Sequence, residues 1–356
     1  MKTSFVPSFL ALVLLAAGAS ARTADPAPLR VGDVVAEAGQ KVSGHLIVPG
    51  GVDPGTRIPV SVVHGTRPGP VLALVAGTHG YEYTAVLALQ RLRARLDPAA
   101  LTGSVILVHL ANPTTFYGRR IYYSPDGKNL NRVYPGKADG TISDRIAHAI
   151  TTEVIARATH VVDMHCGDGN ESLRPYSYWQ LTGDTALDEA GRQMALAFGL
   201  DHIVVDRERP ADPEHTLYTS NTAVRRGKPA ITVESGGMGL TDEVSVRAQE
   251  AGALSVMAHL GMLEAPSLRV EKALWIDRAQ VITSPVTGVW HPAVEKMQNV
   301  ATGTLLGRIT DPFGDALHEL RAPFAGEVLY VVTTPPVSEG EPLAFVGHVV
   351  EGEAKP

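Results

Sequence analysis

The chain has 356 residues, of which 44% are hydrophobic and 19% are charged, and its formal net charge is −6 at pH 7. Such a composition is typical of a globular protein, and the length allows one large core and a smaller second one. A mildly acidic chain without long lysine or arginine runs gives no electrostatic reason to expect nucleic acid as a partner. The only cysteine is Cys166, which excludes an intramolecular disulfide.

The first 21 residues have the pattern of a secretory signal peptide. Lys2 supplies a positive charge, residues 9–17 are apolar, and residues 19–21 (Ala-Ser-Ala) form a small-x-small cleavage site. The apolar stretch is too short to cross a bilayer, and no other segment has the pattern of a membrane span. We therefore expect a secreted or periplasmic protein whose mature chain begins at Arg22.

Residues 22–268 alternate between apolar runs typical of strands and segments with helical periodicity. Short strands joined by turns are predicted within 41–63. The longer predicted strands are 71–76, 105–110, 161–164 and 230–233, and the predicted helices are 83–96, 142–158, 186–198 and 241–260. This alternation predicts an α/β fold with helices on both faces of a sheet. In such sheets reactive groups gather at the carboxyl ends of the strands.

The pattern changes in residues 269–356, where short apolar runs are separated by closely spaced glycine turns. This spacing predicts a small all-β domain, either a barrel or a sandwich. Residues 286–289 and 322–328 look like two versions of one hairpin unit, which indicates an internal duplication.

His79 and Glu82 follow the predicted strand 71–76, at the start of the next helix. Residues three apart on a helical turn face the same side, and imidazole and carboxylate are ordinary zinc donors. On its own, a His-x-x-Glu pair is more often a core or surface histidine beside a capping acid.

His165 and Glu234 each close another predicted buried strand. Polar residues at strand ends are often only solvated. However, His165 completes with His79 and Glu82 the two histidines and one carboxylate common in catalytic zinc sites, which leave one position open for water. We therefore expect one Zn²⁺ ion, with Glu234 as general base for a zinc-activated water. Cys166 is expected to point away, because neighbouring side chains on a strand face opposite sides.

A long polar loop, residues 112–136, follows the strand 105–110 and is rich in arginine and asparagine. Isolated arginines are usually surface charges, but loops after sheet strands line the sites of α/β proteins. Asn131 and Arg132 are predicted to hold a substrate carboxylate, and Arg120 is predicted to stabilise the oxyanion of a tetrahedral intermediate.

Taken in order, these segments resemble the succinylglutamate desuccinylase/aspartoacylase family, which shares its fold with the zinc carboxypeptidases. The matching segments are 77–82, Arg120 with 129–132, 163–165 and 233–237, and the resemblance covers roughly 59–263. It implies a mixed sheet flanked by helices, and it implies the zinc ligands His79, Glu82 and His165 with Glu234 as base. It also implies that Arg120 polarises the scissile carbonyl and that Asn131 and Arg132 hold a carboxylate.

Three departures from aspartoacylase bear on the substrate. Asn129 stands where aspartoacylase has an aspartate, so only a neutral amide oxygen is available there to orient a zinc histidine. The loop between Arg120 and Asn131 is longer than in aspartoacylase, and the chain carries the signal of an exported protein. We therefore expect a small-molecule or short-peptide substrate with a carboxylate, without naming its acyl group.

Two rival interpretations stay open. One is a zinc carboxypeptidase that acts on peptides, including cell-wall peptides. The other is a non-catalytic exported binding module whose working part is the C-terminal β-domain. That domain resembles the biotinyl/lipoyl-like barrels often appended to these deacylases. Its candidate hairpin tip, residues 311–315, has no lysine, and Lys296 lies outside that tip, so we expect a structural or gating role.

Overall fold

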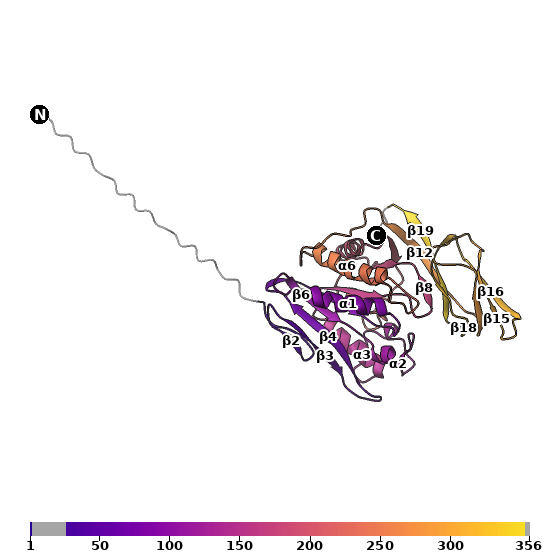
Figure 1. Ribbon diagram of the computed structural model, residues 1–356, viewed down its shortest axis with the longest axis horizontal. Helices are drawn as coiled ribbons and strands as arrows, with labels where there is room; N and C mark the ends of the chain where they lie inside the picture. Colours follow the sequence, from indigo (N-terminus) through magenta and orange to yellow (C-terminus); the bar gives the residue numbers. More distant parts are fainter. Residues whose placement is uncertain (2–25, 353–356) are drawn as a thin grey trace.

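The computed structural model describes Met1 and residues 26–352 (Figure 1). Apart from Met1, the predicted signal peptide lies outside the described residues. Within the described part of the chain, no helix is both long and apolar enough to cross a membrane.

A long mixed sheet forms the frame of the molecule. In its α/β part the strand order is β12-β10-β9-β11-β7-β5-β6-β4-β3. The pairs β5–β6, β5–β7 and β7–β11 are parallel, whereas β9–β11, β4–β6 and β3–β4 are antiparallel. The bounds are β3 Lys41–Val48, β4 Thr56–His64, β5 Arg67–Ala76, β6 Thr102–Val108, β7 His160–His165, β9 Tyr176–Gln180, β10 His202–Asp206, β11 Ala230–Glu234 and β12 Leu274–Thr283. A separate hairpin of β1 (Leu29–Val31) and β2 (Val34–Ala36) precedes them.

Helices cover both faces of this sheet, as the sequence predicts. The helices α1 (Tyr83–Arg95), α4 (Thr185–Phe198) and α6 (Glu243–His259) bury apolar residues in one core. On the other face, α3 (Ile142–Ile150), the π-helical turn η2 (Thr151–Ile155) and α5 (Thr219–Val224) contribute to a second core. The short helix α2 (Pro113–Gly118) and the 3₁₀ turn η1 (Leu130–Arg132) lie in the polar loop after β6. The predicted α/β fold class is confirmed.

Some elements differ from the sequence prediction. The predicted helix 142–158 ends as an α-helix at Ile150 and continues only as the π-helical turn. The five-residue strands β9 and β10 and the six-residue helix α5 were not predicted. Strand β9 also contains the buried polar residues Ser177 and Gln180, and the Gln180 amide donates a hydrogen bond to Asn221 in α5 over 3.1 Å. Contacts with other elements therefore stabilise a strand that its own hydrophobic pattern does not predict.

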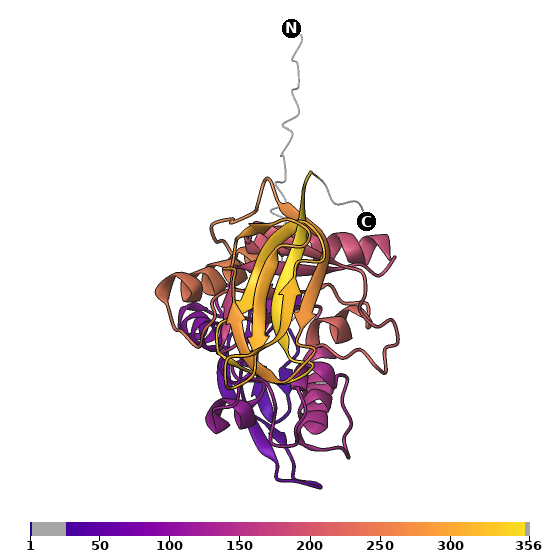
Figure 2. The ribbon, with the colours of Figure 1, turned by 90° about the vertical axis from the view of Figure 1, so that its right-hand side faces the viewer.

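The C-terminal part is antiparallel β structure, and in Figure 2 it lies nearest the viewer in orange and yellow. One four-stranded sheet has the order β16-β15-β13-β18, and it faces strands β14, β17, β19 and β12 of the long sheet. Apolar residues from both sheets, such as Trp290, Leu306, Val328 and Val346, form a single core. The bounds are β13 Gly288–Pro292, β14 Asn299–Val300, β15 Leu305–Thr310, β16 Ala316–Arg321, β17 Gly326–Val332, β18 Pro336–Val337 and β19 Pro342–Glu351.

The two parts are joined by continuous hydrogen bonding. The predicted boundary between residues 268 and 269 falls in the connection between α6 and β12. Strand β12 pairs in parallel with β10 through residues 274–276 on one side, and on its other side it pairs antiparallel with β19 from residue 274 to residue 283. The short strand β8 (Glu171–Leu173), which follows β7, pairs with β17. Lys296 supports this junction, because its ammonium donates a hydrogen bond to the Leu173 carbonyl over 3.0 Å.

Candidate functional site

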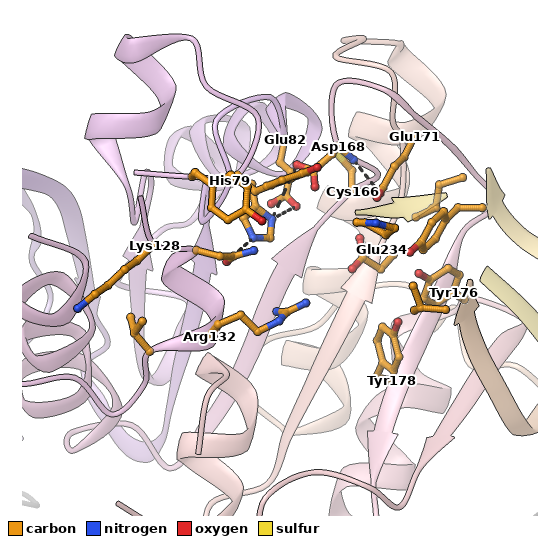
Figure 3. A pocket seen from close by; sticks show the side chains of 18 residues that line it. His79, Glu82, Lys128, Arg132, Cys166, Asp168, Glu171, Tyr176, Tyr178 and Glu234 are labelled. Carbon is orange, nitrogen blue, oxygen red and sulfur yellow. Dashed lines mark hydrogen bonds and ion pairs between the residues drawn. The ribbon is translucent and has the colours of Figure 1, made fainter. Parts of the chain in front are cut away.

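Two parallel strands bring the predicted ligands together. His79 lies in the turn after β5, and His165 is the last residue of the neighbouring strand β7. Glu82 is the residue immediately before α1, so it precedes the first helical turn in which we expected it. The Nδ1 atoms of His79 and His165 lie 2.7 Å and 3.0 Å from the same Glu82 oxygen, Oε1. The three potential ligand atoms all lie within 4.8 Å of one another. Figure 3 shows two of these side chains, His79 and Glu82, next to each other at the pocket.

Gly80 allows the turn that carries His79 to pack closely against the loop after α2. A Cβ atom at this position would lie 2.1 Å from the Arg120 carbonyl oxygen and 2.7 Å from that of Thr115. The Gly80 amide also donates to the Ile121 carbonyl over 2.8 Å. A side chain at position 80 would therefore push the turn away from the loop and displace His79.

The outer nitrogens of both histidines face oxygen atoms. Nε2 of His79 lies 3.1 Å from Oδ1 of Asn129, and Nε2 of His165 lies 3.1 Å from Oδ1 of Asp163, which is fully buried. Because these oxygens accept hydrogen bonds, they favour the proton on Nε2 and leave the Nδ1 lone pairs directed at the common point. Asn129 thus acts through its amide oxygen, as expected. Asp163 was missed, although a residue two before His165 on a strand faces the same side.

The charges at this point are concentrated and buried. Burial lowers the pKa of His79, but the Glu82 and Asp168 carboxylates outweigh it and raise that pKa to about 9. Burial raises the pKa of Glu82, but His165 and His79 outweigh it and lower that pKa to about 2. The cluster therefore attracts positive charge, which protons supply when no cation does. Two imidazoles and one carboxylate around one point fit the donor set of a catalytic divalent metal.

Glu234 lies beside this cluster. It is the last residue of β11 and pairs in register with His165 of β7, so both side chains emerge at the same edge of the sheet. With His79 and Glu82 it lines a pocket of about 550 Å³. Burial raises the pKa of the Glu234 carboxyl well above its ordinary value. A carboxylate with a raised pKa accepts a proton more readily near neutral pH than an exposed one does.

The residues predicted to bind substrate are only partly brought into the pocket. Arg132 lines it, and its guanidinium donates to the Asn131 carbonyl over 2.7 Å and stacks 4.7 Å above the Tyr218 ring centre. Asn131 packs behind His165 instead, with its Oδ1 accepting from the Thr219 amide over 3.0 Å and its Nδ2 lying 3.3 Å from His165 Nε2. Arg120 is exposed and is not among the residues that line the pocket.

Several pocket residues were not anticipated. Asp168 lies in the loop after β7 with its Oδ1 3.9 Å from Nδ1 of His79, and Glu171 begins β8. Burial raises the pKa of Asp168 to about 7 and that of Glu171 to about 8. Tyr330 of β17 and Pro342 of β19 bring the C-terminal part into the wall. No sequence signal identifies these last two, because they reach the pocket only through the β8–β17 and β12–β19 pairings.

Cys166 is buried and contributes to the pocket wall, but it is not part of the His79, Glu82 and His165 cluster. Burial raises the pKa of its thiol well above the ordinary value, so the side chain is neutral. We expected Cys166 to point away from the metal site, but its side chain lines the same pocket as His79 and Glu82, because Cys166 lies just beyond the end of β7, where the alternation of a strand no longer applies.

Comparison with known proteins gives a consistent result. Residues 68–260 match the family model described as the succinylglutamate desuccinylase/aspartoacylase catalytic domain. The chain is 32% identical over 304 residues to an N-alpha-acetyl-L-2,4-diaminobutyric acid deacetylase of Halomonas elongata, with 83% of this chain and 86% of the relative covered.

Two solved structures extend the likeness over the whole fold. A succinylglutamate desuccinylase/aspartoacylase from Rhodobacter sphaeroides superimposes with a TM-score of 0.76 and 27% identity, covering 87% of this chain and 95% of that one. The product-bound ectoine utilization protein EutE (DoeB) from Ruegeria pomeroyi gives 0.78 and 27%, covering 90% and 98%. On this evidence the chain belongs to the succinylglutamate desuccinylase/aspartoacylase family.

Proposed function

We propose that this protein is a zinc-dependent amidohydrolase that removes the acyl group from an N-acyl amino acid with a free carboxylate. The observation that carries the proposal is the convergence of His79, Glu82 and His165 on one point, with Glu234 lining the same pocket as His79 and Glu82. The deacetylase from Halomonas elongata, whose name describes the removal of an acetyl group from an amino acid, supports this reaction class.

The proposed roles follow from the geometry. His79, Glu82 and His165 would hold the zinc ion through Nδ1, a carboxylate oxygen and Nδ1. When bound, the ion supplies a Lewis acid for the scissile carbonyl and for the attacking water. Glu234 accepts a proton from that water and returns it to the leaving nitrogen. Asn129 and Asp163 orient the two imidazoles through their outer nitrogens.

Arg132 is the proposed partner of the substrate carboxylate, because its guanidinium lines the pocket and is held in place by Asn131 and Tyr218. A planar guanidinium binds a carboxylate through two parallel hydrogen bonds. We propose that Asn131 acts behind His165, where its side-chain contacts are already made, instead of on the substrate. The predicted role of Arg120 at the oxyanion requires its exposed side chain to turn toward the pocket.

We also propose that the protein is exported. The support is Lys2, the apolar residues 9–17 and the Ala-Ser-Ala sequence at 19–21. Expression of the full chain with fractionation of the host, followed by N-terminal sequencing, tests this. The expected product is found outside the cytoplasm and begins at Arg22, and a cytoplasmic product that retains Lys2 would contradict it.

A substrate panel tests the proposed reaction. The metal-loaded protein and a chelated control are given N-acyl amino acids, the same compounds as methyl esters, and peptides with free or blocked C-termini. The proposal predicts metal-dependent release of the free amino acid from N-acyl amino acids and little hydrolysis of the methyl esters. Hydrolysis of peptides alone would favour the carboxypeptidase alternative. No amide hydrolysis by the loaded protein would favour a binding module.

A further inference from the structure

A second group of acidic side chains lines the pocket apart from the metal cluster and Glu234. Asp168 and Glu171 lie close together after β7, and Glu171 Oε2 accepts a hydrogen bond from the Asp168 amide over 3.1 Å. Figure 3 shows both residues at the top of the pocket and Arg132 toward the bottom, with Glu234 between these levels. The pocket therefore has an acidic end, which adjoins the metal cluster through the 3.9 Å contact of Asp168 Oδ1 with His79 Nδ1, and a basic end at Arg132, with Glu234 between them.

The acidic end is held by main-chain contacts from two directions. The Met238 amide, in the loop after β11, donates to the carbonyls of both Asp168 and Glu171, over 3.0 Å and 3.1 Å. The Thr333 amide, just after β17, donates to the Asn170 carbonyl over 2.8 Å. Because both flanking segments are fixed, the two carboxylates have little freedom to move out toward solvent.

Among the described residues neither carboxylate is paired with a lysine or arginine, and the basic group nearest Asp168 is the metal-site residue His79, whose Nδ1 lies 3.9 Å from Asp168 Oδ1. Asp168 is 7% exposed, and its Oδ1 has no hydrogen-bond partner among the described residues. The pocket contains two basic side chains besides His79: Arg132 at the opposite end, and Lys128, whose ammonium lies 2.6 Å from Asp144. A buried carboxylate oxygen without a donor is costly unless a ligand supplies one.

We propose that Asp168 and Glu171 form a subsite for a free ammonium group of the substrate. The inference rests on the proposed function, since it assumes that the substrate carboxylate binds Arg132 and that the scissile amide lies beside Glu234. An ammonium group offers three donors to the two carboxylates and offsets one unit of their negative charge. The ammonium belongs either to the side chain of the leaving amino acid or to an aminoacyl group, and a set of matched substrates distinguishes the two.

Three substrates of similar size test the subsite. N-acetyl-2-aminobutyrate has no ammonium, N-alpha-acetyl-2,4-diaminobutyrate carries one on the leaving amino acid, and glycyl-2-aminobutyrate carries one on the acyl group. The kcat/KM of each is measured for the metal-loaded wild type, for Glu171→Gln and Asp168→Asn, and for the matched control Glu264→Gln. Glu264 is exposed after α6 and does not line the pocket. The metal content of every variant is measured as well.

The subsite predicts that the wild type prefers one ammonium substrate over the neutral one by about tenfold or more, as expected for a hydrogen bond between charged groups. Glu171→Gln and Asp168→Asn should each remove most of this preference while leaving the metal content unchanged, and Glu264→Gln should keep it. The substrate that shows the preference identifies which part of the molecule carries the ammonium. The same differences should appear in the Kd values of the intact substrates, measured by calorimetry in a Glu234→Gln background.

Two results would overturn the subsite. One is equal kcat/KM for the neutral substrate and both ammonium substrates, and the other is a preference that survives both substitutions. A fall in metal content in Glu171→Gln would also count against it, because the residue would then act through the metal site. Hydrolysis of the neutral substrate distinguishes failure of the ammonium subsite from failure of the proposed function. If its metal-dependent hydrolysis is observed, the proposed reaction stands whatever happens to the ammonium preference.

Discussion

The α/β part and the C-terminal β part bury very different side chains. The α/β part buries charged and polar groups at the carboxyl ends of its strands, including Asp163, His165 and Glu82. In the described residues after 268, the buried polar side chains are only Ser284 and Thr310. Buried charges are costly unless they are paired, and clusters of buried acidic and basic groups are typical of sites that bind or react. The comparison indicates that the α/β part carries the chemistry and that the β part completes the pocket wall.

The largest effect is expected from Glu234→Gln. A general base contributes about 10²–10⁴-fold to a rate, and glutamine keeps the size of glutamate but cannot accept the proton. We expect kcat to fall by that factor while metal content and the Kd for substrate change little. The matched control Glu264→Gln should retain full activity. An active Glu234→Gln would show that the base is another residue, for which Asp168, 3.9 Å from His79 in the same pocket, is a candidate.

Asp163→Asn tests whether the buried groups behind the metal cluster matter. The Asp163 carboxylate faces Nε2 of His165, and loss of such a partner typically lowers metal affinity by about 10–100-fold. Competition with a chelator measures the affinity. The exposed pair of Asp277 with His348 supplies the control Asp277→Asn, which should leave the affinity unchanged. Equal affinities for both variants would mean that Asp163 only fills space.

Leu306→Ala tests the C-terminal β part, the other region of the comparison. Leu306 is fully buried in the core of the β part, so truncation should lower the free energy of unfolding by about 2–5 kcal/mol. Zinc affinity and kcat/KM of the folded variant should stay close to wild type. Leu317→Ala, at a side chain that is 47% exposed, should change stability by only about 0.5 kcal/mol or less. A folded Leu306→Ala with weakened zinc binding would contradict the division between the two parts.

The smallest effect concerns pH and a histidine of the α/β part outside this pocket. Burial, with the Arg93 charge, lowers the pKa of His109 to about 4, whereas the unfolded chain has a pKa near 6.5. Between these values the unfolded state binds more protons, so the stabilising contribution is complete above about pH 6.5 and is lost as the pH falls toward about 4. Denaturant titrations at pH 7.5 and pH 5 should show a smaller acid destabilisation in His109→Gln than in wild type. Equal losses would contradict this.

The sequence best predicted those site residues that lie at the carboxyl ends of strands. His165 and Glu234 each end an apolar run and His79 follows one by three residues, and parallel strands bring their carboxyl ends to one edge of the sheet. Local pattern and topology were therefore sufficient to predict that these side chains converge. Asp163 was within reach of the same reasoning, since it shares a face with His165 on β7.

The rest of the pocket depends on contacts between distant residues. Glu171 and Tyr330 meet at the pocket only because β8 pairs with β17, and nothing in either local sequence records that pairing. The positions of Arg120 and Asn131 depend on the conformation of a long loop. Asn131 makes its hydrogen bond to Thr219 in α5, a helix that the periodicity did not reveal.

Calorimetric titration of zinc into the demetallated protein tests the central claim most directly. The wild type should bind one equivalent per chain, and Glu82→Gln, which keeps the size of the side chain but removes its charge, should bind far more weakly while remaining folded by circular dichroism. Amide hydrolysis should return in step with the bound zinc. A wild type that takes up no zinc, or a Glu82→Gln variant that binds it as tightly as wild type, would contradict the assignment of His79, Glu82 and His165 as the metal site.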